Sequence, residues 1–363
     1  MLRKYQFYLF PAFFFSLFTL LFSSCGSKEA GKGQSIVNEE NTKILLNWLE
    51  TNGNYIASER APSIIDAPEL FGLQDQNILI IDLRPQEDYD QGHIEFSVNI
   101  GSDHVLDYFK NRIEPSAFDY IVFVCNNDNR SSYVTAVLRL LGYNNTWTLR
   151  FGMSGLDREI ADQFWFANIS NKMVGKLEYT PNEKKKPSNY PSIAANGKSG
   201  FDIVWERAEA IINLPADSIF VSIDQMIDHW DDYYTICYWP EEKYLGVGHL
   251  PGSVQYDQKT SLNQNSELNT LSTEKPNIIY CYSGQHSIFV TAYLRLIGYN
   301  AKALRYGANS FMHQVMAETE SKPTRTFTEK SIFNAPITKS QPAAPANASG
   351  VIPIEKVKVA GGC

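Results

Sequence analysis

One stretch of the sequence occurs twice, and this repeat limits what the chain can fold into. The copies cover residues 120–144 and 277–300, and an offset of 156 residues places Cys125 on Cys281. Each copy contains a short apolar run, a cysteine followed by a polar loop, and an amphipathic run that ends in glycine. A duplicated unit of this size predicts two domains of the same fold, which suits a length of 363 residues.

Both copies predict a strand, a loop and a helix in that order. The apolar run before each cysteine is typical of a short buried parallel strand. After the first cysteine, apolar residues recur at helical spacing, namely Val134, Val137, Leu138 and Leu141. Each cysteine is therefore expected at a strand end, facing the N–H groups of a helix N-terminus, where a thiol should be partly ionised. A small buried cysteine without a chemical role is the alternative.

The first 24 residues have the pattern of an export signal. Arg3 and Lys4 precede a nearly uncharged apolar run at residues 5–22, and small residues then lead to Cys25. This arrangement resembles a bacterial lipoprotein signal, which implies that Cys25 is lipidated. An uncleaved membrane anchor is the alternative, because the apolar run is just long enough to span a bilayer. Both interpretations predict an exported, membrane-anchored protein facing the periplasm or the cell surface.

Charge and cysteine spacing argue against two classes of site. The net charge is −8 and no basic stripe interleaves with aromatic residues, so no nucleic-acid partner is expected. The five cysteines show no metal-ligand spacing, so no metal is predicted. A disulfide framework would be thin for a chain of this length in an oxidising compartment, and reactive thiols fit better.

Further motifs surround the first cysteine. Asp82 and Arg84 end an apolar strand, a Glu-x-Tyr-x-x-Gly-His-Ile pattern follows at residues 87–94, and Cys-x4-Arg-Ser begins at Cys125. Together these motifs resemble the rhodanese family. The resemblance implies an α/β fold with two tandem rhodanese-like domains, each a small parallel sheet flanked by helices. It also implies sulfur transfer through a cysteine persulfide, with no metal or organic cofactor.

The second copy keeps only part of this pattern. An alignment on the proline that follows places Cys237 and Trp239 at the positions of Asp82 and Arg84, while His249 keeps its Gly-His turn. In the first copy, the Asp82–Arg84 pair is expected either to brace the cysteine loop or only to hold its own turn.

Two more supporting residues carry predictions. His93 is expected to be a structural, hydrogen-bonding histidine rather than an acid or a base. Cys237 should lie at a strand end near Cys281, and the two could form a disulfide if their α-carbons lie within about 7 Å. A packed, unpaired Cys237 is the alternative.

The length of the first loop distinguishes two reactions. Both phosphoester cleavage and sulfur transfer use thiolate attack beside backbone N–H groups. Four residues separate Cys125 from Arg130, and the loop of cysteine phosphatases is one residue longer. The tighter ring suits a single sulfane sulfur and favours sulfur transfer.

The two loops are expected to differ in how well they bind an anionic sulfur donor. The residues expected to line them are Asn126, Asn127, Asp128, Asn129, Arg130 and Ser131 in the first copy, and Tyr282, Ser283, Gly284, Gln285, His286 and Ser287 in the second. Asp128 should oppose an anionic donor, whereas Gly284 permits unusual backbone angles and His286, neutral or partly protonated, could help to bind an anion. Cys281 is therefore the preferred catalytic cysteine, and Cys125 is the second candidate.

The expected boundaries follow the repeat. The resemblance spans about residues 64–165 and 222–312, and the predicted parts are a signal peptide at 1–24, a tether at 25–41, a first domain at 42–171, a linker at 172–200, a second domain at 201–320 and a flexible tail at 321–363. The tail ends in Cys363, which could relay sulfur to or from an active cysteine.

The resulting functional prediction is a sulfurtransferase. Its partners would be a small sulfur donor, such as thiosulfate or a persulfide, and a thiol or cyanide acceptor. One alternative is a catalytically silent rhodanese-like module that binds or regulates another molecule. Another is a thiol–disulfide redox protein that uses Cys237, Cys281 or Cys363.

Overall fold

A computed structural model describes residues 36–73 and 75–339. The predicted signal peptide at 1–24, the lipidation site Cys25, most of the tether, and residues 340–363 with Cys363 lie outside the described residues. Within the described ranges, none of the helices has the length and apolar character needed to cross a bilayer.

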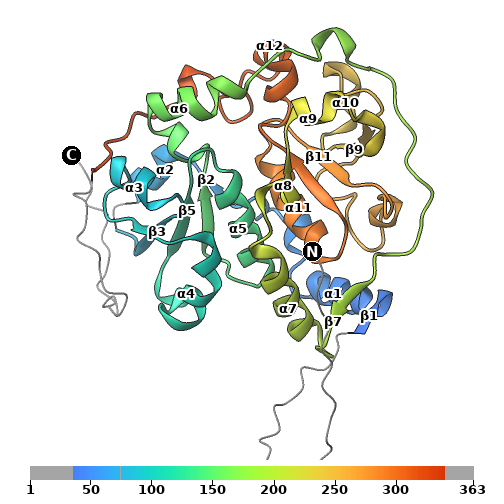
Figure 1. Cartoon of the computed structure of the whole chain (residues 1–363), viewed down its shortest axis with the longest axis horizontal. Helices are drawn as coiled ribbons and strands as arrows, with labels where there is room; N and C mark the ends of the chain where they lie inside the picture. The colour runs from blue at the N-terminus through green and yellow to red at the C-terminus, as the bar shows by residue number, and fades with distance from the viewer. Residues whose placement is uncertain (1–35, 74, 340–363) are drawn as a thin grey trace, which may run out of the picture. The chain divides into compact units, whose positions relative to one another are not determined.

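The first domain is built on a five-stranded, fully parallel sheet (Figure 1). Its strands, in spatial order, are β2 (Ile64–Ile65), β6 (Thr146–Leu149), β5 (Tyr120–Val124), β3 (Ile78–Asp82) and β4 (Val98–Asn99). Its helices are α2 (Ala67–Gly72), α3 (Gln86–Gln91), α4 (Val105–Asn111), α5 (Asn129–Leu140) and α6 (Arg158–Phe164). All five residues of β3 are buried, as expected for a strand covered by helices on both faces.

The second domain repeats this arrangement. Its parallel strands, in the corresponding spatial order, are β8 (Phe220–Val221), β12 (Ala301–Leu304), β11 (Asn277–Tyr280), β9 (Tyr234–Cys237) and β10 (Val254–Gln255). Its helices are α7 (Gly200–Ile212), α8 (Ala216–Ile219), α9 (Ile223–Ile227), α10 (Glu241–Val247), α11 (Gln285–Leu296) and α12 (Asn309–Thr319). The predicted architecture, two small parallel sheets flanked by helices, is thus confirmed.

The helices that follow the two cysteines, α5 and α11, pack against each other between the sheets. The sequence predicts amphipathic helices here, but every described residue of α5 except Arg130 is buried. Each helix covers its own sheet with one face and the partner helix with another, so little of its surface remains for solvent.

The N-terminal helix α1 (Glu39–Thr51) packs on α7 of the second domain. Strand β1 (Ile36–Asn38), just before it, pairs antiparallel with β7 (Ile193–Ala195). A Cβ placed on Gly200 would lie 2.2 Å from the Cβ of Trp48, so the two helices approach closely at that glycine. Helix α1, which was expected to begin the first domain, therefore packs on the second domain. Strand β7, which was expected to be part of the linker, pairs with β1 beside that helix.

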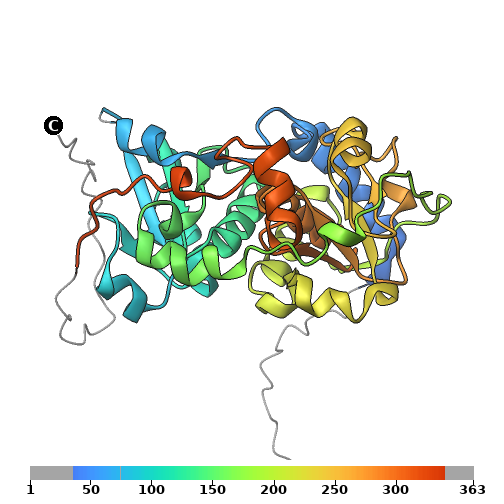
Figure 2. The same cartoon turned by 90° about the horizontal axis from the view of Figure 1, so that it is seen from above.

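The segment after α12 differs from the flexible tail predicted from residue 321. Figure 2 shows it running from the second domain to the first. Phe327 is fully buried and stacks on Trp165 at 4.6 Å, and the backbones of Thr338 and His93 exchange two hydrogen bonds. Residues 321–339 are thus packed in place, and the prediction was wrong because isolated aromatic anchors produce no periodic pattern.

Candidate active site

Each cysteine lies directly after the central strand of its sheet and before a buried helix, as predicted. The loop turns into the helix through one left-handed residue, which is Asp128 (φ 65°) in the first domain and Gly284 (φ 90°) in the second. The sequence singled out Gly284 for this conformation, whereas the non-glycine residue at the equivalent position adopts it too.

A glycine after the neighbouring strand fixes each loop from behind. The carbonyl of Cys125 accepts a hydrogen bond from Met153 N–H, and that of Cys281 accepts one from Ala308 N–H, both at 2.9 Å. A Cβ on Gly152 would lie 2.1 Å from the Cys125 carbonyl oxygen, so no side chain fits there. A Cβ on Gly307 would likewise lie 2.3 Å from the Cys281 carbonyl oxygen. Apart from the glycines themselves, no sequence pattern indicated this role.

Backbone and hydroxyl groups surround both sulfur atoms. The Cys125 Sγ lies 3.5 Å from Ser131 N and 3.4 Å from Ser131 Oγ. The Cys281 sulfur is hydrogen-bonded by the N–H groups of Ser287, Gly284 and His286, which lower its pKa. The backbone N–H groups of Ser131 and Asn127 act in the same direction on the Cys125 thiol. The prediction that the second loop is the better cradle stays a prediction.

Burial and hydrogen bonding have opposite effects on the pKa of both thiols. Cys125 is 7% exposed and Cys281 is 2% exposed. Desolvation raises the pKa of both thiols above the ordinary value and outweighs the N–H groups. The expectation of partly ionised thiols is therefore wrong for this conformation, because the sequence shows the loop but not the side chains that cover it.

Cys281 lies in a buried apolar cluster with Trp239 and Tyr282, and these two rings are called its aromatic cover below. Tyr282 stacks on Trp239 with ring centroids 4.7 Å apart, and the guanidinium of Arg325 lies 4.4 Å from the centre of the Tyr282 ring. Arg325 is held by Glu320, which also pairs with Lys243 at 2.6 Å. The cover of the second cysteine is thus anchored by the segment that follows α12.

Cys237 is buried beside Cys281. In the parallel register it stands opposite Tyr280, just as Asp82 stands opposite Val124, which confirms the alignment of the two copies. The Tyr280 hydroxyl hydrogen-bonds its sulfur, and burial raises the pKa of the Cys237 thiol. Cys125, Cys237 and Cys281 are all free thiols, so the disulfide considered between Cys237 and Cys281 is not formed.

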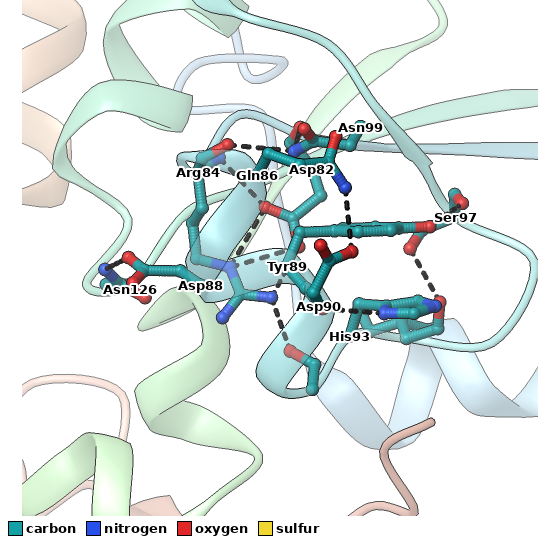
Figure 3. Close-up of polar contacts among 12 residues, drawn as sticks. Asp82, Arg84, Gln86, Asp88, Tyr89, Asp90, His93, Ser97, Asn99 and Asn126 are labelled. Atoms are coloured by element: carbon teal, nitrogen blue, oxygen red, sulfur yellow. Dashed lines mark hydrogen bonds and ion pairs between the residues drawn. The ribbon is translucent and has the colours of Figure 1, made fainter. Parts of the chain in front are cut away.

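Asp82 and Arg84 form a buried ion pair in the first domain (Figure 3). Arg84 Nη2 lies 2.7 Å from Asp82 Oδ2 and donates a second hydrogen bond to the Gly92 carbonyl at 2.6 Å. These contacts hold the turn between β3 and residue 92. The first loop is instead tied to α3 by Asn126, whose amide donates to Asp88 at 3.1 Å. The geometry agrees with the interpretation that the pair holds its own turn.

His93 and His249 occupy matching structural positions. The ring of His93 stacks on Tyr89 at 3.8 Å, and its Nδ1 lies 2.8 Å from the Tyr89 carbonyl oxygen (Figure 3). The ring of His249 stacks on Tyr244 at 3.7 Å, and its Nε2 lies 3.0 Å from the Thr180 carbonyl oxygen. His93 holds the turn after α3 and His249 the turn after α10, in line with the structural role predicted for His93.

The first loop directs its charged residues away from the sulfur. Arg130 donates from Nε to Ser102 Oγ and from Nη1 to the Leu214 carbonyl, both at 3.1 Å, so it does not close the ring around Cys125. The amide of Asn127 donates to the Tyr306 hydroxyl at 2.8 Å. Asn129 N–H lies 3.4 Å from Asn127 Oδ1, within the loop itself. The loop side chains therefore serve the packing between the domains.

Asp128 points toward the second domain rather than into its own loop. Its Oδ2 accepts hydrogen bonds from Phe151 N–H at 2.7 Å and from the Gln285 amide. Gln285 in turn accepts from Arg150 Nη1 at 3.0 Å, and Arg150 is paired with Asp66. Burial raises the pKa of Asp128 to about 8. The two cysteine loops are thus linked directly through Asp128 and Gln285, which the sequence did not predict.

The remaining residues of the second loop are held internally. Ser283 donates to Gln285 Oε1 at 3.2 Å, and Ser287 donates to the Gly284 carbonyl at 2.6 Å. Burial lowers the pKa of His286 to about 3, so the ring is neutral near pH 7 and cannot supply the positive charge considered for it.

Two pockets open beside the first loop. One of about 440 Å³ is lined by Asn126, Asp88 and Arg84 among others, and one of about 500 Å³ is lined by Asn127, Tyr306 and Arg305 among others. Neither sulfur atom lines either pocket. Within residues 36–73 and 75–339, no group of three or more His, Cys, Asp or Glu side chains could hold a metal ion.

Comparison with protein families connects this geometry to a known domain. The family of the rhodanese-like domain matches residues 70–159 and 238–314, which contain the two cysteine loops. Each matched region lies on one of the two parallel sheets, which is consistent with two tandem rhodanese-like domains. No curated protein matches the sequence significantly.

Several solved structures match the chain at low identity and with low TM-scores. A rhodanese-related protein from Thermoplasma volcanium is 21% identical, with 28% of this chain and 92% of that chain covered at a TM-score of 0.23. A thiosulfate sulfurtransferase from Pseudomonas aeruginosa is 17% identical, with 73% and 46% covered at a TM-score of 0.27. A 3-mercaptopyruvate sulfotransferase from Escherichia coli is 18% identical, with 66% and 97% covered at a TM-score of 0.23.

Proposed function

We propose that the protein is a sulfurtransferase and that Cys281 carries the sulfur as a persulfide. The observation that supports this most is the position of Cys281 between the end of β11 and the N-terminus of α11, where the backbone N–H groups of Gly284, His286 and Ser287 act to lower the pKa of its thiol. Such a ring stabilises a thiolate before the reaction and the outer sulfur of a persulfide after it. The match of both regions to the rhodanese-like domain supports the same reaction class.

The reaction has two steps that use the same sulfur atom. The Cys281 thiolate attacks the outer sulfur of thiosulfate, the donor S–S bond breaks, and sulfite leaves with the electron pair. An acceptor thiolate or cyanide then attacks the outer sulfur of the persulfide, and the electron pair of that S–S bond returns to Cys281. No oxidant, metal or organic cofactor is required, and Cys125 can follow the same route as the second candidate.

The cover over Cys281 has to open for this chemistry. Tyr282 and Trp239 stack on each other in the buried cluster that contains Cys281, and the guanidinium of Arg325 lies over the Tyr282 ring. Opening would admit water and the donor, and it would lower the thiol pKa because desolvation is the main cause of the raised value. The proposed chemistry therefore requires movement of the segment that carries Arg325.

The proposal extends to the ends of the chain. Export and lipidation at Cys25 would place the two domains at a membrane surface, facing the periplasm or the cell exterior, and Cys363 would offer a further thiol for sulfur relay. Both expectations come from the sequence alone.

The direct test is the intact mass of the purified full-length protein after reduction, incubation with thiosulfate and removal of excess donor. We expect a gain of one sulfur atom that cyanide removes. The Cys281→Ser variant should lose the gain, whereas Cys237→Ser should keep it, because Cys237 faces Tyr280 rather than the N–H ring. Loss of the gain in Cys125→Ser alone would assign the reaction to the first domain.

A binding or regulatory module without catalysis is the second candidate. The observation that favours it is the burial of both loop cysteines with raised thiol pKa values. If thiosulfate and a small persulfide donor both leave the mass unchanged, this second function replaces the first.

A further inference from the structure

A second difference between the domains lies at the end of the strand beyond each cysteine loop, where each domain has an arginine. In the first domain, Arg150 follows β6 and its backbone N–H donates to the Ile65 carbonyl at 3.0 Å; in the second, Arg305 follows β12 and donates to the Val221 carbonyl at 2.9 Å. The residue after Ile65 is Asp66, whereas Ser222 follows Val221. The same backbone therefore presents an arginine beside a carboxylate in one domain and beside a hydroxyl in the other.

This exchange leaves the guanidinium of Arg305 without a carboxylate partner. Arg150 Nε pairs with the carboxylate of Asp66. The Nε of Arg305 is buried and has no hydrogen-bond partner, and no ion pair of Arg305 occurs among the described residues. Its guanidinium lies 5.5 Å from the centre of the Phe220 ring. A buried guanidinium N–H that makes no hydrogen bond is costly, so a missing acceptor is the simplest explanation.

Arg305 lines a pocket that can hold such an acceptor. The pocket has a volume of about 500 Å³, and Ser222, Tyr306, Lys172 and Asn127 also line it. Asp224 is the acidic residue of its wall, and it is paired with Lys172. The charge of Arg305 is therefore not offset within the pocket, and the Ser222 hydroxyl is at hand as a second donor.

We propose that this pocket binds a small organic carboxylate, which pairs with Arg305 as Asp66 pairs with Arg150 in the first domain. The site is separate from the sulfur chemistry, because neither cysteine lines it. It does touch the first loop, since Asn127 forms part of the wall and its amide donates to Tyr306. Sulfate would satisfy the same charge with a different shape and serves as the comparison ligand.

The test is calorimetric titration of the full-length protein with acetate, succinate and sulfate at constant ionic strength. We expect one carboxylate site, and at least a tenfold loss of affinity in Arg305→Gln. Arg150→Gln is the matched control, because Arg150 already has its carboxylate partner, and it should bind like the wild type.

A second pair of variants keeps the test independent of folding. Ser222 caps α9 by accepting a hydrogen bond from Gln225 N–H at 3.2 Å, and both Asp and Asn replace serine well at this position. Ser222→Asp should place its own carboxylate on Arg305 and reduce binding at least tenfold, whereas Ser222→Asn should bind within about twofold of the wild type. The proposal is overturned if no carboxylate binds in the tens of millimolar range, if sulfate alone binds, or if Ser222→Asp and Arg305→Gln bind like the wild type.

Discussion

The two cysteine loops share a backbone and differ in what their left-handed residue does. Gly284 has no side chain to place, and its loop directs three N–H groups at the Cys281 sulfur. Asp128 accepts the strain of a positive φ angle and uses its carboxyl group to reach Phe151 and Gln285. The comparison shows that the side chains of the first loop contact the second domain, whereas the left-handed residue of the second loop has no side chain for such a contact.

The residues that follow the strand next to each cysteine loop, at the ends of β3 and β9, also differ between the domains. The first domain holds its turn with the buried Asp82–Arg84 pair, and the second replaces that pair with Cys237 and Trp239. Trp239 then stacks on Tyr282 and covers Cys281. The second domain has thus exchanged a polar turn for an apolar cover over its cysteine.

Breaking the ion pair of the first domain should be the most destabilising of the substitutions. Arg84→Met leaves the Asp82 carboxylate buried without its partner and should cost about 3–5 kcal/mol in the free energy of unfolding. The double variant Asp82→Asn, Arg84→Met removes the buried charge and should recover part of that loss. Urea unfolding followed by circular dichroism measures both, and a double variant no more stable than the single one would contradict the electrostatic explanation.

The glycine behind the first loop should be the next most sensitive position. Gly152→Ala would place a Cβ 2.1 Å from the Cys125 carbonyl oxygen at a φ of 58°, and should destabilise the protein by about 3 kcal/mol. Gly142→Ala is the matched control, because its φ is also positive but no atom lies within 4 Å of the added Cβ. It should cost about 1 kcal/mol. Equal losses in thermal unfolding would show that the close contact does not matter.

The strand–loop–helix order around each cysteine could be predicted because it depends on local patterns. The match of Cys237 with Asp82 also followed from the sequence, since one proline fixed the register of the second copy. By contrast, the contact between Asp128 and Gln285 depends on how α5 and α11 pack, which neither copy encodes alone.

The burial of the thiols was missed for a related reason. The cover of Cys281 includes Arg325, which lies 44 residues further along the chain in a segment without periodicity. The direction of Arg130 was missed too, because its acceptor at Leu214 belongs to the second domain. Motifs predict which residues enter a loop, but contacts between distant segments decide where their side chains point.

Asp128 should make stability depend on pH. Its pKa is raised to about 8, so the folded protein keeps a proton that the unfolded chain releases above about pH 4. Stability should therefore fall as the pH rises from about 4 to about 8, by at most about 1.4 kcal/mol per pH unit. Asp128→Asn keeps an acceptor oxygen for Phe151 and Gln285 but cannot ionise, so its profile should be flatter and its stability at pH 8 higher.

The control for this profile is Asp162→Asn, on the exposed face of α6, where Asp162 pairs with Arg158. Its dependence on pH between about 4 and 8 should follow the wild type. Unfolding midpoints in urea at several pH values measure all three proteins. A wild-type slope that persists unchanged in Asp128→Asn would place the responsible group elsewhere.

The finest difference between the sites is the exposure of their sulfur atoms. Cys125 is 7% exposed, Cys281 is 2% exposed and Cys237 is fully buried, and burial raises the pKa of all three thiols. Iodoacetamide should therefore modify Cys125 first, Cys281 more slowly and Cys237 last, and each rate should rise with pH because only the thiolate reacts. Peptide mass spectrometry of quenched samples measures the order, and in urea the three cysteines should react alike. Faster modification of Cys281 than of Cys125 in the folded protein would mean that the aromatic cover opens readily, and that the second site is the more accessible of the two.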